Sequence, residues 1–202
     1  MNEEKKADDA DDGGERTLVT SAARGDRDAF DRLIRAHMNR VFNLCFRMMG
    51  DHEEAGDCAQ DTFLKAYRSL KDFRGDSSFS TWICSIAVNT CKTRLQSAAY
   101  RYGRNAVSLA ATGSSTPDAG SVDPPDPAPT VLDAMERHEV EHSLQAAIQA
   151  LPADARSVIV LRDVEGFSYE EISRMTGWPI GTVKSRIARA RGQLRSAIRG
   201  VL

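Results

Sequence analysis

A proline-rich segment divides this chain near its middle. Five of the seven prolines lie between residues 110 and 131, together with Gly, Ser, Thr and Asp. Each proline lacks a backbone hydrogen-bond donor and disfavours helical backbone at the residue before it. The segment therefore cannot pack as a helix or as a strand within a sheet, and we expect a flexible linker between two small folded domains.

Charge is distributed unevenly around this linker. The chain of 202 residues has a formal net charge of −2. Residues 1–15 and 103–142 each carry seven acidic and two basic side chains, which leaves 23 basic and 15 acidic side chains elsewhere. The small net charge thus conceals basic folded parts, which are typical of proteins that bind nucleic acid. We expect a disordered acidic tail over residues 1–15, domains over 16–100 and 135–202, and the linker over 101–134.

The sequence carries neither a targeting signal nor a paired cysteine motif. Its N-terminus is acidic and has no apolar core, which is unlike a secretory signal. The longest uncharged apolar run, residues 82–88, is too short to span a bilayer, so we expect a cytoplasmic protein without membrane insertion. The cysteines at 45, 58, 84 and 91 form no C-x-x-C pair. We expect buried thiols rather than a disulfide framework or a zinc site, and a redox or metal-sensing role stays open.

Apolar residues recur at helical spacing through both expected domains. Three stripes in residues 16–100 occupy positions 30, 33, 34, 38, 41, 42, 45, 46 and 49; 55, 58, 59, 63, 66, 67 and 70; and 82, 83, 86, 87, 91 and 95. Spacings of three and four predict amphipathic helices that bury one core. Further helical segments follow the linker and no convincing strand pattern is present, so the sequence predicts an all-α fold.

Residues 168–195 carry the signals of a helix-turn-helix. Ser168 and Glu171 have the spacing of a capping box, Gly177 lies in a turn, and Pro179 opens the last helix. The buried face of that helix is predicted at Ile180, Val183, Ile187, Ala190, Leu194 and Ile198. Trp178, at the expected N-cap, is a poor capping residue and leaves the start of the helix undefined.

The last helix has the composition of a DNA-reading helix. From residue 180 onward the chain has six basic residues and no acid. A helix of this kind fits the major groove, where arginine reaches guanine and hydroxyl groups reach bases or phosphates. Phosphate contacts make such binding fall steeply with salt. The candidates for DNA contact are Thr182, Lys184, Ser185, Arg186 and Arg189.

This C-terminal part resembles the promoter-reading helix of extracytoplasmic-function sigma factors, a compact branch of the sigma-70 family. The resemblance lies in residues 181–186 (Gly-Thr-Val-Lys-Ser-Arg), 189–191 (Arg-Ala-Arg) and 164–172, and in the Leu-Pro pair at 151 and 152. LuxR-type regulators share a similar Gly-Thr-Val-Lys-Ser helix, so this half alone leaves two families open. A stand-alone LuxR-like regulator is therefore the alternative.

The N-terminal half resembles sigma region 2, in residues 57–67, 73–83 and 86–90, and lacks the strand–helix alternation of a receiver domain. The resemblance implies two surfaces. One, for the β′ clamp helices of RNA polymerase, comprises Asp57, Gln60, Asp61 and Lys65. The other, for the unpaired strand of the −10 element, comprises Trp82, Asn89, Lys92, Thr93 and Arg94. Amide and basic side chains suit base edges and phosphates, whereas the apolar position of Trp82 favours a core role over base stacking.

The family resemblance also implies partners and a reaction. It implies binding to core RNA polymerase through its β′ and β subunits, recognition of −10 and −35 promoter DNA, and an anti-sigma factor that holds the protein inactive. Catalysis would belong to the polymerase, so we expect no enzyme activity, no cofactor and no metal. The −35 element would be read by the last helix.

One motif points elsewhere. Residues 138–142 read His-Glu-Val-Glu-His, the H-E-x-x-H pattern in which two histidines hold zinc and the glutamate polarises water. A zinc hydrolase also needs a third ligand and a cleft, and residues 143–148 supply no further histidine. We expect two solvent-facing histidines on a charged helix.

Overall fold

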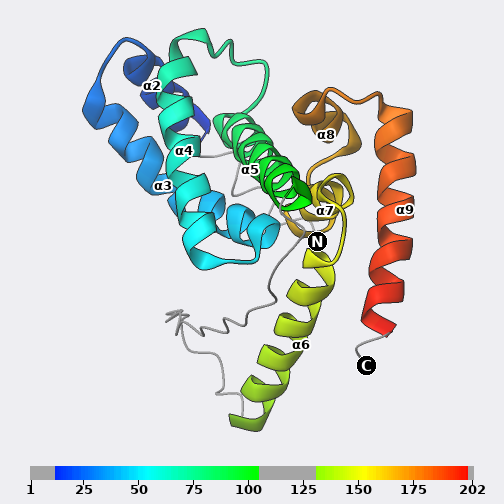
Figure 1. Ribbon diagram of the computed structural model, residues 1–202. Coiled ribbons are helices and arrows are strands. Elements are labelled where there is room, and N and C mark those ends of the chain that lie inside the picture. Colours follow the sequence, from blue (N-terminus) through cyan, green and yellow to red (C-terminus); the bar gives the residue numbers. More distant parts are fainter. Residues whose placement is uncertain (1–11, 105–130, 200–202) are drawn as a thin grey trace.

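Every regular element in the described part of the chain is a helix, as the sequence predicts. The computed structural model describes residues 12–104 and 131–199 (Figure 1). The first domain contains α2 (Asp12–Ala23), α3 (Arg27–Met49), α4 (His52–Ser69), the 3₁₀ turn η1 (Leu70–Asp72) and α5 (Phe79–Arg104). The second contains α6 (Val131–Gln149), α7 (Ala153–Ile159), the π-helical η2 (Val160–Val164), α8 (Tyr169–Thr176) and α9 (Ile180–Arg199).

Local capping sets the boundaries of the first domain's helices. The Asp26 carboxylate accepts a hydrogen bond from the Ala29 N–H at the start of α3, and Asp51 does the same for Glu54 at the start of α4. Between them Gly50 ends α3 with a φ of +77°, a left-handed conformation that glycine adopts without strain. Sequence-local chemistry therefore sets the facing ends of α3 and α4.

The helices bury a core that coincides with the predicted stripes only in part. Among the largest side chains that are almost fully enclosed in the first domain, Leu33, Val41 and Ile83 lie at predicted positions, whereas Leu44, Met48 and Val88 do not. Conversely, two predicted core residues of α3 and α4 lie at the surface, where Met38 is 50% exposed and Tyr67 is 47% exposed. Tyr67 keeps one ring face against Phe30, with 5.0 Å between the ring centroids.

The second domain forms the predicted helix-turn-helix. Ser168 and Glu171 make the capping box at the start of α8, and Gly177 ends α8 with a φ of +72°. Val183, Ile187 and Ala190 of α9 are buried, but Ile180 is 40% exposed because it is the first helical residue. Pro179, expected as the first residue of this helix, lies just before it, and its carbonyl accepts from the Val183 N–H, so α9 begins at Ile180.

Three helices extend into the segments expected to be tail and linker. Residues 12–15, expected in the tail, belong to α2, and residues 101–104 and 131–134, expected in the linker, belong to α5 and α6. Glu15 explains the first difference. Its carboxylate lies 3.2 Å from Nε2 of the buried His37 and accepts the backbone N–H groups of Phe79 and Ser80. These contacts tie α2 to α3 and to the start of α5.

A Glu15→Gln variant is expected to lose about 1 kcal/mol of unfolding free energy at neutral pH. The hydrogen bond with His37 lowers the pKa of Glu15 more than burial raises it, below the ordinary 4.5. The ionised carboxylate therefore stabilises the fold above about pH 4.5, and this contribution is lost as the pH falls through the lowered pKa. Urea unfolding between pH 3 and pH 7 should show the two proteins converging in acid. Glu141→Gln, at an exposed position of α6, is the control, and a constant gap would contradict this account.

The two domains pack against each other. Helix α5 contacts α3 and α4 on one side and α7 and α8 on the other, while α6 contacts α3 (Figure 1). Carbonyls in the last turn of α3 accept side-chain donors from the second domain, and the Phe46 carbonyl also accepts the Gly50 N–H at 2.8 Å. Gln145 donates to the Phe46 carbonyl at 3.1 Å, Gln149 donates to that of Arg47 at 2.9 Å, and Arg156 donates to that of Met48. The second domain thus caps a helix of the first.

Candidate nucleic-acid and polymerase interfaces

Four of the five residues predicted for −35 contact share one face of α9. Ser185 and Arg186 each lie three or four residues from both Thr182 and Arg189, so the four residues lie on the same side of the helix. Ser185 and Arg189 are exposed, whereas Thr182 and Arg186 are half-buried. Lys184 is exposed on the other flank, where its Nζ lies 5.6 Å from the centroid of the Tyr169 ring. We call the four shared residues the α9 face.

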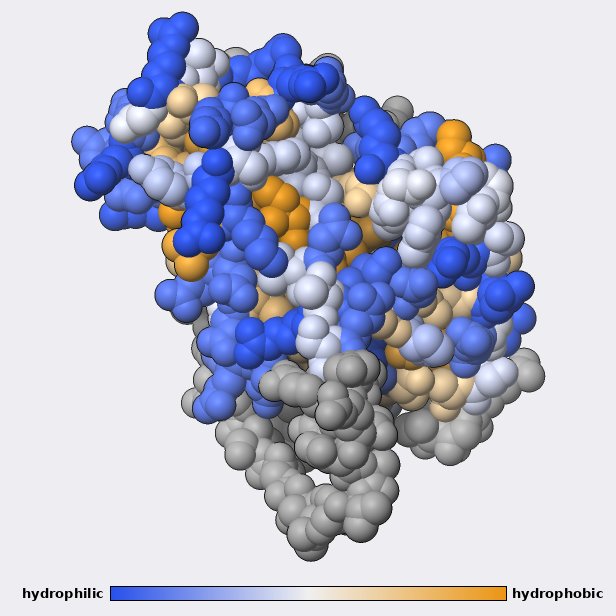
Figure 2. Space-filling view, turned by 45° about the horizontal axis from the view of Figure 1, so that its top comes forward, coloured by the Kyte–Doolittle hydropathy of each residue, from blue (hydrophilic) through white to orange (hydrophobic). Residues whose placement is uncertain are grey.

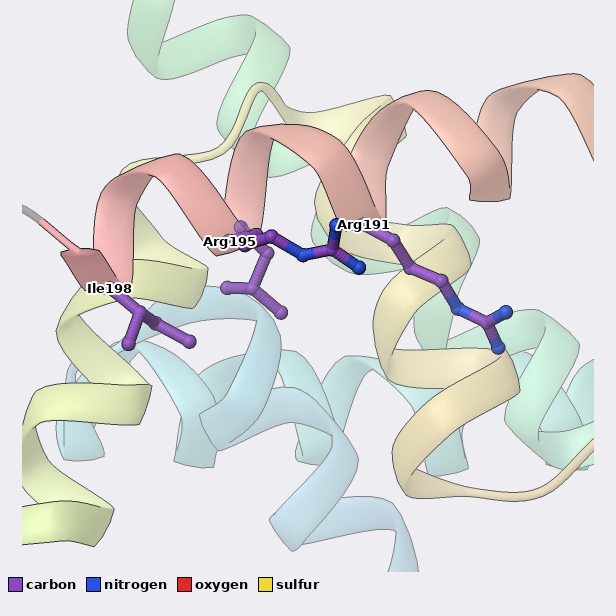
Figure 3. A pocket seen from close by; sticks show the side chains of 4 residues that line it. Arg191, Arg195 and Ile198 are labelled. Carbon is purple, nitrogen blue, oxygen red and sulfur yellow. The ribbon is translucent and has the colours of Figure 1, made fainter.

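A second arginine group occupies the C-terminal half of α9. Arg191, Leu194, Arg195 and Ile198 line an open groove of about 300 Å³ (Figure 3). Arg191 makes a two-pronged ion pair with Asp163, with 3.1 Å between its Nε and one carboxylate oxygen. This pair stays within the second domain and fixes η2 against α9.

The residues predicted for −10 contact differ in their exposure and in whether they are already engaged in ion pairs. Asn89 and Thr93 are exposed one turn apart on α5, and the Thr93 hydroxyl donates to the Asn89 carbonyl at 2.9 Å. Arg94 binds Glu54 and Asp57 of α4, the latter at 2.8 Å. Lys92 turns toward the second domain. Asn89 and Thr93 are therefore the exposed members of this predicted surface.

Trp82 belongs to an aromatic cluster at the start of α5. Its ring centroid lies 5.0 Å from that of Phe73 and 5.6 Å from that of Phe79, and Trp82 is half-buried. Phe73 precedes the loop in which Gly75 has a φ of +74°. The cluster supports this loop, which agrees with the expected core role of Trp82.

The residues predicted for polymerase contact all lie on the exposed side of α4. Asp57, Gln60, Asp61 and Lys65 are exposed, although Lys65 also donates to the Thr90 hydroxyl on α5 at 2.9 Å. Leu64 is 49% exposed beside them. We call these five residues the α4 stripe. The polar pattern indicated four of them, but an exposed leucine has no signature in a sequence that also needs leucines for its core.

The sequence missed the residue that joins the two predicted DNA surfaces. Asp154 in the first turn of α7 binds Lys92 of α5 at 2.9 Å and Arg186 of α9 at 2.8 Å. Burial acts to raise the pKa of Asp154, but the hydrogen bonds from Lys92 and Arg186 outweigh it and hold this pKa below its ordinary value. The carboxylate is therefore ionised at neutral pH.

The cysteines and histidines give no described metal site. All four thiols are buried, as expected. Burial raises the pKa of Cys84 to about 12, and Cys91 hydrogen-bonds with Cys45 and Cys58. His142 is exposed, and the side chains of His138 and Glu139 lie outside the described residues. Among described side chains, no group of three or more potential ligands is close enough to hold a metal ion.

The molecular surface is mostly hydrophilic on the face drawn in Figure 2, with small hydrophobic areas between charged side chains. Within the described ranges, no helix combines the length and apolar character that crossing a bilayer requires.

Comparison with known proteins assigns the family. Residues 33–106 match the model of Sigma-70 region 2, and residues 141–194 match that of Sigma-70, region 4. The chain is 39% identical to the RNA polymerase sigma-H factor of Pseudomonas aeruginosa over 185 residues, which cover 92% of this chain and 94% of that protein. It is 33% identical to the ECF RNA polymerase sigma-E factor of Escherichia coli K12 over 188 residues, covering 93% and 96%.

A solved structure has the same fold. The sigma factor RpoE from Bartonella quintana, in a co-crystal with an anti-sigma factor, superposes with a TM-score of 0.63 at 24% identity, covering 84% of this chain and 96% of that one. The matches to both regions do not favour the LuxR-like alternative or the zinc hydrolase. Two sigma regions in one chain, on two helical domains of the matching fold, show that this protein belongs to the extracytoplasmic-function sigma factors of the sigma-70 family.

Proposed function

We propose that this chain directs transcription initiation as a dissociable subunit of RNA polymerase. The observation that carries the proposal is the presence of both sigma regions in one chain, at the identities given above. The first domain binds core polymerase and opens the −10 element, and the second reads the −35 duplex. Bond formation in the RNA belongs to the polymerase, and this chain acts where the polymerase and the chromosome lie, in the cytoplasm.

The α9 face supports the assignment of −35 recognition. Arg189 and Ser185 are exposed on a helix that follows a tight turn, the arrangement that places a recognition helix in the major groove. The exposed Lys184 lies on the opposite flank, where it is suited to a phosphate of the adjoining backbone. Base contact by Arg189 and phosphate contact by Lys184 would give specificity and salt dependence, respectively.

The first domain supports the other two assignments. The α4 stripe offers two carboxylates, an amide and an exposed leucine, a mixture typical of the polar rim and apolar centre of a transient protein interface. On α5, Asn89 and Thr93 offer groups that pair with the edges of unstacked bases. These surfaces lie on different helices, so polymerase and DNA bind without competing for the same side chains.

We also infer that an anti-sigma factor binds this chain. The sigma factor RpoE, which has the same fold, was solved in complex with the anti-sigma factor NepR. On α6 the apolar residues Val140 and Leu144 are 64% and 36% exposed. Their exposed apolar surface is available for a partner protein to cover. The chemistry of these residues suits an amphipathic helix.

Transcription from fragmented genomic DNA of the source organism tests the proposed function. Purified core polymerase and this protein are mixed, and the 5′ ends of the transcripts are sequenced. We expect discrete start sites that share two upstream elements, and these starts should be absent when either component is omitted. Tight DNA binding by the free chain, together with no association with core polymerase, would contradict the proposal and favour a stand-alone regulator.

A further inference from the structure

Two cations that we assign to DNA contact are held together across the domain boundary. Lys92 of α5 binds one carboxylate oxygen of Asp154 at 2.9 Å, and Arg186 of α9 binds the other at 2.8 Å. The side chain of Lys92 is only 15% exposed and that of Arg186 is 37% exposed. A carboxylate thus occupies, for each cation, the position that a phosphate oxygen would take on DNA.

Trp178 reinforces this arrangement from the turn before α9. Lys92 Nζ lies 4.4 Å from the centroid of the indole, and Arg186 Cζ lies 4.0 Å from it. These distances allow cation–π attraction to both groups, and partial burial strengthens it. Trp178 and Asp154 together satisfy both cations in the absence of nucleic acid.

The surrounding contacts show that this domain arrangement is built into the sequence. Arg40 of α3 binds Glu165 at 2.9 Å, where the glutamate side chain is only 10% exposed, and its guanidinium lies 5.3 Å from the Phe167 ring centroid. Arg174 of α8 donates to the Asp76 carbonyl, in the loop before α5, at 3.1 Å. Charged groups at this depth cost free energy unless they are paired, so the pairs specify one packing of the domains.

We propose that Asp154 is an internal competitor of DNA phosphate that keeps the free protein closed. This inference rests on the proposed function, because it takes Lys92 and Arg186 as DNA contacts. In the closed form both cations face Asp154 and Trp178, and Asp154 of α7 links α5 to α9. Promoter DNA engages both cations only after the domains separate, which binding to core polymerase would bring about. The ionic latch comprises Asp154, Lys92, Arg186 and Trp178.

Two matched substitutions test the latch in the full chain. Asp154→Asn and Asp163→Asn each remove one carboxylate that binds an arginine of α9, and each raises the net charge equally. Only Asp154 contacts the first domain. We expect Asp154→Asn to raise the affinity of the free protein for duplex DNA about tenfold more than Asp163→Asn does. Fluorescence anisotropy with a labelled duplex at fixed salt measures this difference.

A measurement of the distance between the two domains distinguishes opening of the domains from a purely local effect of the altered charge. Dyes on Lys71→Cys and Gln193→Cys, both exposed positions, report the separation of the domains, while the four native thiols are buried. Asp154→Asn should lower energy transfer and Asp163→Asn should not. Glu165→Gln, which breaks the other interdomain ion pair and contacts none of the assigned DNA residues, should lower energy transfer and raise DNA affinity as well.

The outcomes distinguish the latch from the proposed function. Equal DNA affinities and equal energy transfer for Asp154→Asn and Asp163→Asn would overturn the latch, even if wild-type holoenzyme starts transcription normally. Higher affinity without lower energy transfer would also overturn it, because the effect would then be local. If the wild-type chain never activates core polymerase, the proposed function fails, and the energy-transfer comparison still decides whether Asp154 closes the protein.

Discussion

An Asp61→Lys variant is expected to bind core RNA polymerase about a hundredfold more weakly than the wild type. Asp61 is exposed at the middle of the α4 stripe, and reversing its charge places a cation where we propose that basic groups of the polymerase dock. Like charges brought together at an interface cost several kcal/mol, and about 2.7 kcal/mol corresponds to a hundredfold change. Titration of labelled core enzyme in the absence of DNA measures the loss.

The matched control is Glu141→Lys. It makes the same change in net charge at an exposed position of α6, and it should leave the affinity for core polymerase within about twofold. Asp61→Lys should also keep the wild-type circular dichroism spectrum and affinity for duplex DNA, because Asp61 contributes to neither the core nor the α9 face. Unchanged core affinity in Asp61→Lys would remove α4 as the polymerase surface.

An Arg156→Met variant is expected to lose about 3 kcal/mol of unfolding free energy. The Arg156 guanidinium is buried and donates to the carbonyls of Met48, Gln149 and Leu151. Methionine fills similar space but leaves these acceptors without their donors, on both sides of the domain boundary. For a chain of this size the loss corresponds to a fall in Tm of roughly 10 °C, which differential scanning calorimetry measures.

Arg195→Met is the control for this stability prediction. Arg195 is exposed on α9, and a surface substitution of this kind usually changes stability by less than about 0.5 kcal/mol. Because Arg156 also joins the domains, limited proteolysis of Arg156→Met should cleave between them faster than in the wild type. Equal melting temperatures for the two variants would mean that water replaces the lost donors and that Arg156 is not an essential link.

Sequence-local interactions were the part of the fold that could be read in advance. The capping box joins Ser168 to Glu171, three residues apart, and Gly177 ends the same helix. Apolar spacing along α9 correctly gave Val183, Ile187 and Ala190 as buried. Such features are visible because both partners lie within one or two helical turns. The same periodicity wrongly predicted that Tyr67 is buried. Its exposure of 47% depends on which other helices pack beside α4.

The candidate surfaces also have a part that local sequence indicates and a part that depends on tertiary packing. The polar residues of the α4 stripe and the α9 face could be proposed from the sequence because helical spacing and family resemblance indicate the same positions. By itself the sequence determined the all-α class, the capping of several helices, the order of the two sigma regions and the sigma family. Only the tertiary structure decided that Lys92 and Arg186 meet at Asp154, that Arg156 caps α3, and that Glu15 is anchored by His37. These partners lie 22 to 108 residues apart, and no local pattern encodes a contact that forms only when whole helices pack.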